Sequence, residues 1–167
     1  MTPTTYRDQV AELAVSDPEK GVEIARKITD PWFEAQAWAH LARHSSTPLK
    51  FSNKASEAAA RTKDDYQRSA VRAWEIAALA ERDHRTQART ALTQAVELAS
   101  TIEHQGSRSE ALLLLLQAAA KISKEDAAVV AEVIRSTCDS SHWRGQRAVN
   151  YASKMIDGEW LPREFFW

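Results

Sequence analysis

The chain has 167 residues, of which 44% are hydrophobic and 27% charged, and its 22 Lys and Arg against 23 Asp and Glu leave a formal net charge of −1. This length is enough for one domain with a sizeable core, and the charge balance excludes a bulk attraction to nucleic acid or to an acidic membrane. The one cysteine, Cys138, excludes an intramolecular disulfide. We find no apolar run long enough to cross a bilayer and no signal peptide, so we expect a cytoplasmic protein.

Nine helices are predicted from the placement of proline and from apolar periodicity. Four of the five prolines directly follow a residue that caps helix N-termini, at Thr2-Pro3, Asp17-Pro18, Asp30-Pro31 and Thr47-Pro48. Proline suits the first turn of a helix because its φ is already helical and its missing N–H would have no partner there. No stretch alternates polar and apolar residues for long enough to predict a strand. The expected helices lie near residues 4–15, 18–29, 31–44, 48–63, 66–82, 84–103, 107–122, 124–138 and 142–157.

The apolar residues of these helices repeat along the chain. Equivalent pairs occur at Ala37-Trp38, Ala73-Trp74, Ala111-Leu112 and Ala148-Val149, if one residue of slip is allowed around the second pair. A period of about 37 residues is typical of stacked helical hairpins. A position that accepts Trp, Leu and Val requires bulk and apolarity, so we expect Trp38 and Trp74 to belong to the core.

The stretch from Ala25 to Ala42, with the pattern A-x-x-I-x-D … E-A-x-A-W-x-x-L-A, resembles bacterial α-solenoid repeats of the tetratricopeptide-like or HEAT-like type. The resemblance covers residues 18–157. It departs from the tetratricopeptide consensus, because the period is longer and no Leu-Gly or Tyr follows each Trp in the consensus places. The resemblance implies a single all-α domain over residues 1–167: a right-handed αα-superhelix of about four stacked antiparallel hairpins, with a concave surface for partners and no catalytic residue.

Residues spaced four apart, and turned away from the apolar stripe, form a candidate binding groove. Equivalent helices contribute Trp32, Gln36 and His40, then Arg68 and Arg72, and finally Trp143, Arg147 and Tyr151. Trp and Arg are enriched at interaction hot spots. The intervening repeat has Gly106, Glu110 and Leu114 at these places, which interrupts the pattern. The alternative interpretation is a solvated helix face, and either interpretation expects Arg72 and Arg147 to be exposed.

No residue set specifies a reaction, a metal or a cofactor. His40 and His44 have the spacing of two metal ligands on one helix, but no third ligand accompanies them and Arg43 would repel a cation. Glu81 and His84 have the spacing found in di-iron bundles, but the second copy that such a site needs is missing. A glycine-rich phosphate loop and a nucleophile elbow are also absent from the sequence. We therefore expect no enzyme, no cofactor and no metal.

The expected function is a non-enzymatic scaffold that binds a protein or peptide on its concave face. One alternative is a small-molecule binder or enzyme that uses a polar pocket between hairpins, with His40, Glu81 or His84. Another is a nucleic-acid binder, for which the basic residues are Arg61, Lys63, Arg68, Arg72, Arg85 and Arg89. A membrane partner is not expected.

An aromatic tail follows Gly158, which is a plausible helix C-cap. We expect residues 158–167 to fold over the last hairpin, since terminal repeats of a solenoid need a cap. The covering residues would be Trp160, Leu161, Phe165, Phe166 and Trp167, and the covered ones Val129, Val133, Val149, Ala152 and Met155. A monomer is then favoured. The alternative is a homodimer formed through the tail.

Overall fold

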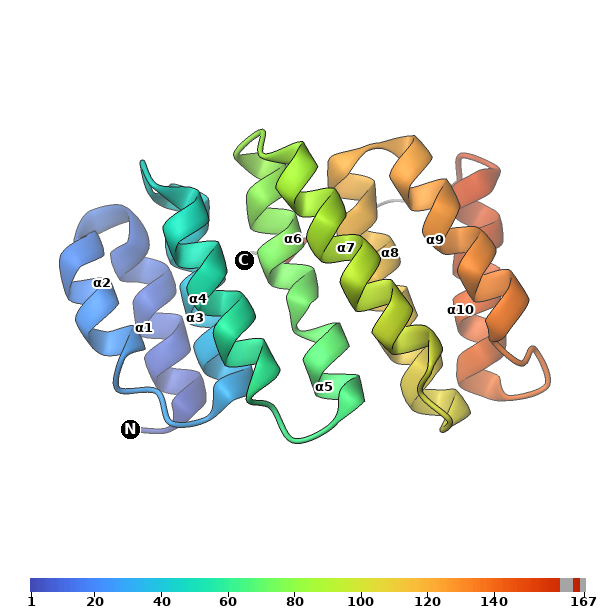
Figure 1. The fold of residues 1–167 in the computed structure, drawn as a ribbon, viewed down its shortest axis with the longest axis horizontal. Helices are drawn as coiled ribbons and strands as arrows, with labels where there is room; N and C mark the ends of the chain where they lie inside the picture. The colour runs from blue at the N-terminus through green and yellow to red at the C-terminus, as the bar shows by residue number, and fades with distance from the viewer. Residues whose placement is uncertain (160–163, 166–167) are drawn as a thin grey trace.

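The computed structural model describes residues 1–159 and 164–165, and within them it contains ten α-helices and no strand (Figure 1). The helices are α1 (Pro3–Ser16), α2 (Pro18–Ala25), α3 (Pro31–His44), α4 (Pro48–Ala60), α5 (Asp65–Ala70), α6 (Arg72–Glu81), α7 (Arg85–Ser100), α8 (Gln105–Ile122), α9 (Lys124–Thr137) and α10 (Trp143–Ile156). The predicted all-α fold is confirmed.

The four prolines predicted to begin helices do so, in α1, α2, α3 and α4. Three of them follow a side chain that accepts a backbone hydrogen bond from the first turn: Thr2 from Thr5, Asp17 from Lys20, and Asp30 from Trp32. These bonds satisfy N–H groups that have no partner inside the helix. The helix starts are therefore encoded locally.

One predicted helix, residues 66–82, is divided into α5 and α6 at Val71. Val71 keeps helical backbone angles, and its carbonyl accepts from the N–H of Trp74 at 3.3 Å, which is a bond over three residues. Such a bond tightens the chain relative to an α-helix and rotates the residues that follow it. The break lies where the repeat needs its one-residue slip.

The helices form two layers (Figure 1). Layer A consists of α1, α3, α5 with α6, α8 and α10, and each of these packs against the next. Layer B consists of α2, α4, α7 and α9, each antiparallel to a layer A helix that precedes it in the chain. Within layer B, α7 and α9 meet directly, but over a smaller contact than any neighbours in layer A. The fold is thus a stack of four helical hairpins followed by α10.

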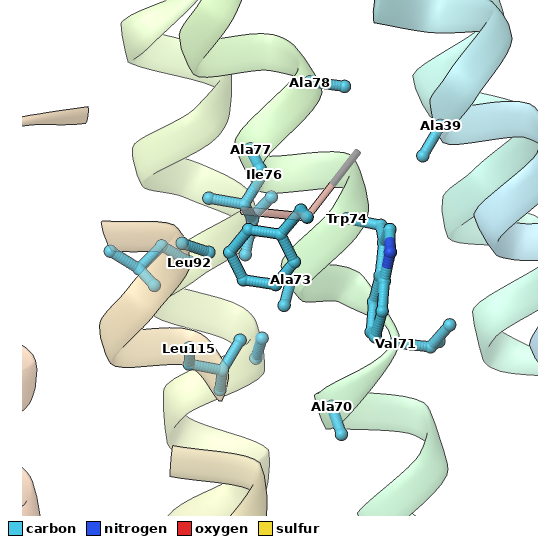
Figure 2. Close-up of a cluster of buried hydrophobic side chains, with 14 of the residues drawn as sticks. Ala39, Ala70, Val71, Ala73, Trp74, Ile76, Ala77, Ala78, Leu92 and Leu115 are labelled. Carbon is cyan, nitrogen blue, oxygen red and sulfur yellow. The ribbon is translucent and has the colours of Figure 1, made fainter. Parts of the chain in front are cut away.

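Small and aliphatic side chains fill the space between the layers. Ala37, Ala73, Ala111 and Ala148, the first members of the four repeat pairs, are all fully buried. Trp38 and Trp74 are buried too, as predicted. Their surroundings differ, however. The Trp38 ring stacks on Phe51 of α4, inside a hairpin, whereas Trp74 projects from α6 toward α3, on the side where Ala39 lies (Figure 2).

The described part of the tail does not cover the last hairpin. Phe165 is buried against Trp74 of α6, and Glu164 lies beside Lys121 of α8. Val129 of α9, one of the residues expected to be covered, remains exposed. Trp160, Leu161, Phe166 and Trp167 lie outside the described residues.

Candidate functional site

The outward surface of layer A, called here the A face, carries one hollow toward the N-terminal end of the stack and a group of adjoining hollows toward the C-terminal end. The N-terminal hollow has a volume of about 570 Å³ and lies between α1, α3 and α6. Gln36, only 2% exposed, forms part of its wall and accepts a hydrogen bond at 2.8 Å from the Arg7 guanidinium of α1. Arg7 also lies over the Phe33 ring, 5.7 Å from its centroid. Two neighbouring helices are thereby connected through polar groups on this surface.

His40 lies in the same hollow and is 7% exposed. Burial, together with the positive charges of Arg7, Arg43 and His44, lowers the pKa of its imidazole to about 4, against an opposing effect of Asp8. His40 is therefore neutral at physiological pH. A neutral imidazole both donates and accepts a hydrogen bond, so His40 can face a partner without adding charge.

Trp74 and Phe165 form the other wall of the N-terminal hollow. Their ring centroids are 5.5 Å apart, and the planes meet at 78°, the edge-to-face arrangement that aromatic pairs favour. Beside them, the Glu164 carboxylate lies 3.6 Å from Nζ of Lys121. Residues near the end of the chain thus occupy a surface built by its first half.

A row of aromatic rings connects the two hollows. Trp32 of α3 packs edge-on against Trp74 at 5.9 Å and is stacked on Tyr66 of α5 at 6.2 Å. Tyr66 then lines the C-terminal hollow, which has a volume of about 420 Å³. Burial, with a further effect of the nearby Glu110 carboxylate, raises the pKa of the Tyr66 phenol. The phenol is consequently protonated and can donate a hydrogen bond.

The C-terminal hollow is dominated by Trp143 of α10, which is 61% exposed. The Arg144 and Arg147 guanidinium carbons lie 5.0 and 5.8 Å from its ring centroid, within the range of a cation–π interaction. Tyr151, one helical turn after Arg147, is also exposed and shares a second, adjoining hollow with Trp143. Aromatic and cationic groups therefore alternate along one face of α10.

Glu110 of α8 forms an ion pair with Arg147 and lies 4.0 Å from Arg144. Behind it, Oε1 of Gln117 is buried without a hydrogen-bond partner, in a small hollow that Arg147 and Tyr151 also line. A buried acceptor without a donor carries a free-energy cost.

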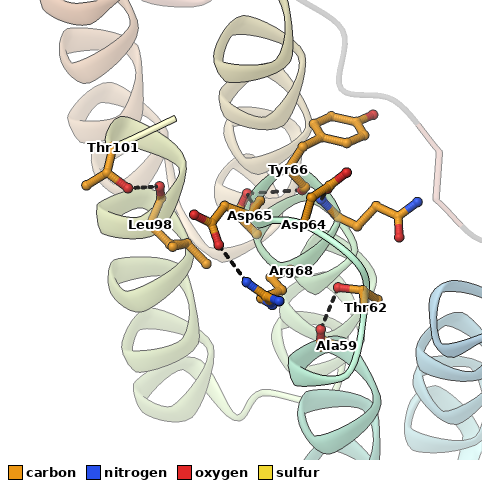
Figure 3. A network of polar contacts seen from close by, with 10 residues as sticks. Ala59, Thr62, Asp64, Asp65, Tyr66, Arg68, Leu98 and Thr101 are labelled. Carbon is orange, nitrogen blue, oxygen red and sulfur yellow. Dashed lines mark hydrogen bonds and ion pairs between the residues drawn. The ribbon is translucent and has the colours of Figure 1, made fainter. Parts of the chain in front are cut away.

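Six of the eight residues predicted for the groove lie on the A face: Trp32, Gln36, His40, Trp143, Arg147 and Tyr151. The other two do not line either hollow. Arg68 pairs with Asp65 on α5 itself, and in Figure 3 it points away from Tyr66. Arg72 pairs with Glu75 and donates to Gln94 of α7 in layer B.

The break at Val71 explains this difference, because a spacing of four residues does not follow one helix face across it. The residues of this repeat that reach the A face are Tyr66 and Trp74. Arg72 was expected to be exposed, but it lies in a mostly buried ion pair with Glu75. Glu110 was interpreted as an interruption of the pattern, and it is instead the partner of Arg147.

Sequence reasoning did not identify Arg7, Tyr66 and Arg144 as groove residues. Arg7 belongs to a helix outside the range of the repeat, so no pattern pointed to it. Arg144 follows Trp143 directly, and this adjacency of an exposed aromatic residue and a cation is the signal that could have found it.

The basic residues proposed for nucleic-acid binding are mostly paired. Arg61, Arg68, Arg72, Arg85 and Arg89 lie next to Glu34, Asp65, Glu75, Asp83 and Asp126 respectively. Each carboxylate offsets a charge that a phosphate would otherwise neutralise. Lys63 is the one member of the proposed patch for which the described residues show no ion pair.

Among residues 1–159 and 164–165, no three His, Cys, Asp or Glu side chains are grouped as metal binding would require. Glu81 pairs with Arg43 and lies 4.0 Å from Lys121, while His84 precedes α7. His40, Glu81 and His84 therefore do not line one common hollow in the described part of the chain. None of the described helices combines the length and the apolar character needed to span a bilayer.

Comparison with protein-family models, with curated proteins and with solved structures gives no match. The function is therefore inferred from the geometry of the A face.

Proposed function

We propose that this chain is a non-enzymatic helical-repeat scaffold, similar to tetratricopeptide and HEAT proteins, that binds a protein or peptide segment along the A face. The A face would be the concave side of a right-handed superhelix. The closer packing of helices within layer A than within layer B supports this curvature, because the inner layer of a curved stack has the shorter path. Repeat proteins commonly use such surfaces for binding.

The observation that carries the proposal is the exposure of Trp143 between two arginines, at the edge of adjoining hollows. Covering a large, solvent-exposed aromatic ring with a partner lowers the free energy of the system and so favours binding. Trp, Tyr and Arg are also the residue types that dominate measured hot spots. Arg147 and Arg144 share one carboxylate, Glu110, so their combined charge exceeds that of this partner.

The partner that fits is an extended peptide with acidic and apolar side chains. Its carboxylates would face Arg144 and Arg147, and an apolar side chain would lie on Trp143. No bond in the partner is made or broken.

The test is selection of peptides on the full chain from a random display library, followed by fluorescence polarisation with the selected sequences. Trp143→Ala and Arg147→Ala should each weaken binding at least about tenfold, the effect of a typical hot spot. Val129→Ala, an exposed change on α9 in layer B, is the matched control and should leave the affinity unchanged.

Equal binding to all three variants would contradict the proposal. So would a selection that yields no peptide, combined with salt-sensitive binding of a single-stranded oligonucleotide that is lost in Arg147→Ala. That outcome would identify the C-terminal hollow as a nucleic-acid site.

A further inference from the structure

We infer that the Trp74 side of the N-terminal hollow is a binding site for an aromatic side chain that directly follows an acidic one, and that Phe165, packed on Trp74, and Glu164, beside Lys121, occupy this site as a ligand in cis. The partner in trans is then a peptide with the same acidic–aromatic pair. This inference rests on the proposed function, since it assigns a ligand to the second hollow of the same face.

Phe165 provides the anchor. It is 3% exposed although it lies outside any helix, and its ring packs edge-to-face with Trp74 at the hollow that Gln36 and His40 also line. Its ring is therefore almost completely removed from water, in contact with a residue of α6 that lies far earlier in the chain. Burial of one aromatic side chain in a preformed pocket is how peptide-binding grooves commonly gain affinity.

Trp74 gives this site an aromatic surface on which a second ring can pack. At the equivalent repeat position, Trp38 lies inside its hairpin, stacked on Phe51 of α4. The break at Val71 turns Trp74 out of its own hairpin, toward α3 and the A face. A tryptophan on this surface needs an apolar cover, and Phe165 supplies it.

Glu164 provides the direction of the peptide. Its side chain is 73% exposed and lies 3.6 Å from Nζ of Lys121. An ion pair this exposed adds little affinity. It does favour a carboxylate on the N-terminal side of the ring, because Lys121 lies on that side. Arg7 and Arg43 also line the hollow, each paired with a carboxylate, that of Asp8 and that of Glu81, so Lys121 is the cation that faces Glu164.

A ligand on the same chain has a high effective concentration, on the order of millimolar for a short flexible connection. A free peptide must therefore compete with the tail, and the full chain should bind it weakly. Replacement of Phe165 removes the competitor and leaves the pocket, so binding in trans should increase.

The test uses full chains and a fluorescent synthetic peptide with the sequence of residues 159–167. The peptide should bind the Phe165→Leu chain at least about tenfold more tightly than the unchanged chain, as loss of a cis competitor requires. The same peptide with Ala in place of both aromatic residues that directly follow a glutamate, Trp160 and Phe165, should bind the Phe165→Leu chain at least about tenfold more weakly. Leucine keeps the segment apolar, and circular dichroism will report whether the variant is folded.

Lys121→Glu is the second variant, because it leaves Phe165 in place. It repels Glu164 and should also increase binding in trans, with a preference for a peptide that carries Lys in place of Glu at the Glu-Phe step. This reversal of charge preference does not depend on the stability of the Phe165 variant.

The inference is overturned if the labelled peptide binds the unchanged and Phe165→Leu chains equally, or binds neither while both are folded. The tail would then be a structural part of the fold. A dimer that dissociates in Phe165→Leu would also overturn it, since the occupant would be a second copy. Trp143→Ala should not affect this peptide, whereas it should weaken binding of peptides selected for the C-terminal hollow at least about tenfold, so the two proposals fail separately.

Discussion

Arg147 of α10 forms an ion pair with Glu110 of α8, and the two residues are 37 positions apart, so they hold the same place in consecutive repeats. Arg89 and Asp126 form a second such pair, also 37 positions apart. Neighbouring repeats thus contact each other through equivalent positions that carry opposite charges.

The Arg147–Glu110 pair predicts a small, recoverable effect on stability. Arg147→Glu brings two carboxylates together on a partly exposed surface and should lower the free energy of unfolding by about 0.5–1 kcal/mol. The double change Arg147→Glu with Glu110→Arg restores opposite charges and should recover most of that loss. Urea denaturation of the unchanged chain, Arg147→Glu, Glu110→Arg and the double variant forms a double-mutant cycle. An effect of the single change as large as that of a core substitution would contradict the surface position of this pair.

Trp38→Ala should be strongly destabilising. The Trp38 ring is buried, stacks on Phe51 with centroids 5.9 Å apart, and donates from Nε1 to the Glu34 carboxylate at 3.1 Å. Its removal leaves a cavity between α3 and α4, which costs about 3–5 kcal/mol. Thermal and urea denaturation measure this. An unchanged melting temperature would mean that the ring is free in solution.

Arg72→Met should destabilise the fold by about 3 kcal/mol, because it leaves the Glu75 carboxylate, 5% exposed, without its cation. Burial already raises the pKa of Glu75, against the opposing effect of Arg72. The buried environment therefore favours the protonated, neutral form of Glu75 over its carboxylate. The loss should accordingly shrink as the pH falls toward the ordinary pKa of a glutamate.

The matched control is the double change Arg72→Met with Glu75→Met, which removes both charges. It should be more stable than Arg72→Met alone. If the double variant is no more stable than the single one, the cost arises from lost packing or from the bond to Gln94.

His40 should make stability depend on pH. Its pKa in the folded chain is about 4, below the ordinary value of 6.5, so the unfolded chain binds the proton more readily. The contribution of His40 is therefore fully present above about pH 6.5 and is lost as the pH falls toward 4. Urea denaturation at pH 7.5, 6 and 5 should show a steeper loss of stability in the unchanged chain than in His40→Gln.

His44 remains in both chains, and its pKa is also lowered by burial, so the comparison isolates His40. Parallel pH profiles for the two chains would show that His40 keeps its ordinary pKa. Such a result would require the imidazole to be open to water.

Gly145→Ala should prevent close packing at the start of α10. A Cβ at this position would lie 2.0 Å from the backbone oxygen of Asp139, which cannot move as a side chain can. We expect a loss of about 2–3 kcal/mol, near the upper part of the range for overpacking. Gly106→Ala is the control, because its nearest neighbours are atoms of the movable Arg144 and His104 side chains. It should change stability by less than about 1 kcal/mol.

The sequence predicted the helices well because their signals are local. Asp17, Asp30 and the prolines after them act within one turn. The division at Val71 was not predicted, since residues 66–82 keep an apolar helical period and contain neither Gly nor Pro. Because this division was not predicted, Arg68 and Arg72 were assigned to the groove although they do not line either hollow.

The residues of the candidate site that lie on a single helix were predicted from the sequence. Those that come together from distant segments were missed. Trp143, Arg147 and Tyr151 follow one face of α10, so their spacing was informative. The contact of Phe165 with Trp74 depends on the path of the tail, which no local pattern encodes. Gln36 and Arg7 likewise come together only through the packing of α1 on α3.

The looser packing of layer B has a mechanical consequence. A stack whose helices touch closely on one side and sparsely on the other bends most easily by spreading or closing the sparse side. The buried alanines of layer A then act as a line of pivots, and α2, α4 and α7 can change their separation with little loss of buried surface. Tension applied to the two ends would therefore be stored elastically as a change in curvature, before any helix unfolds.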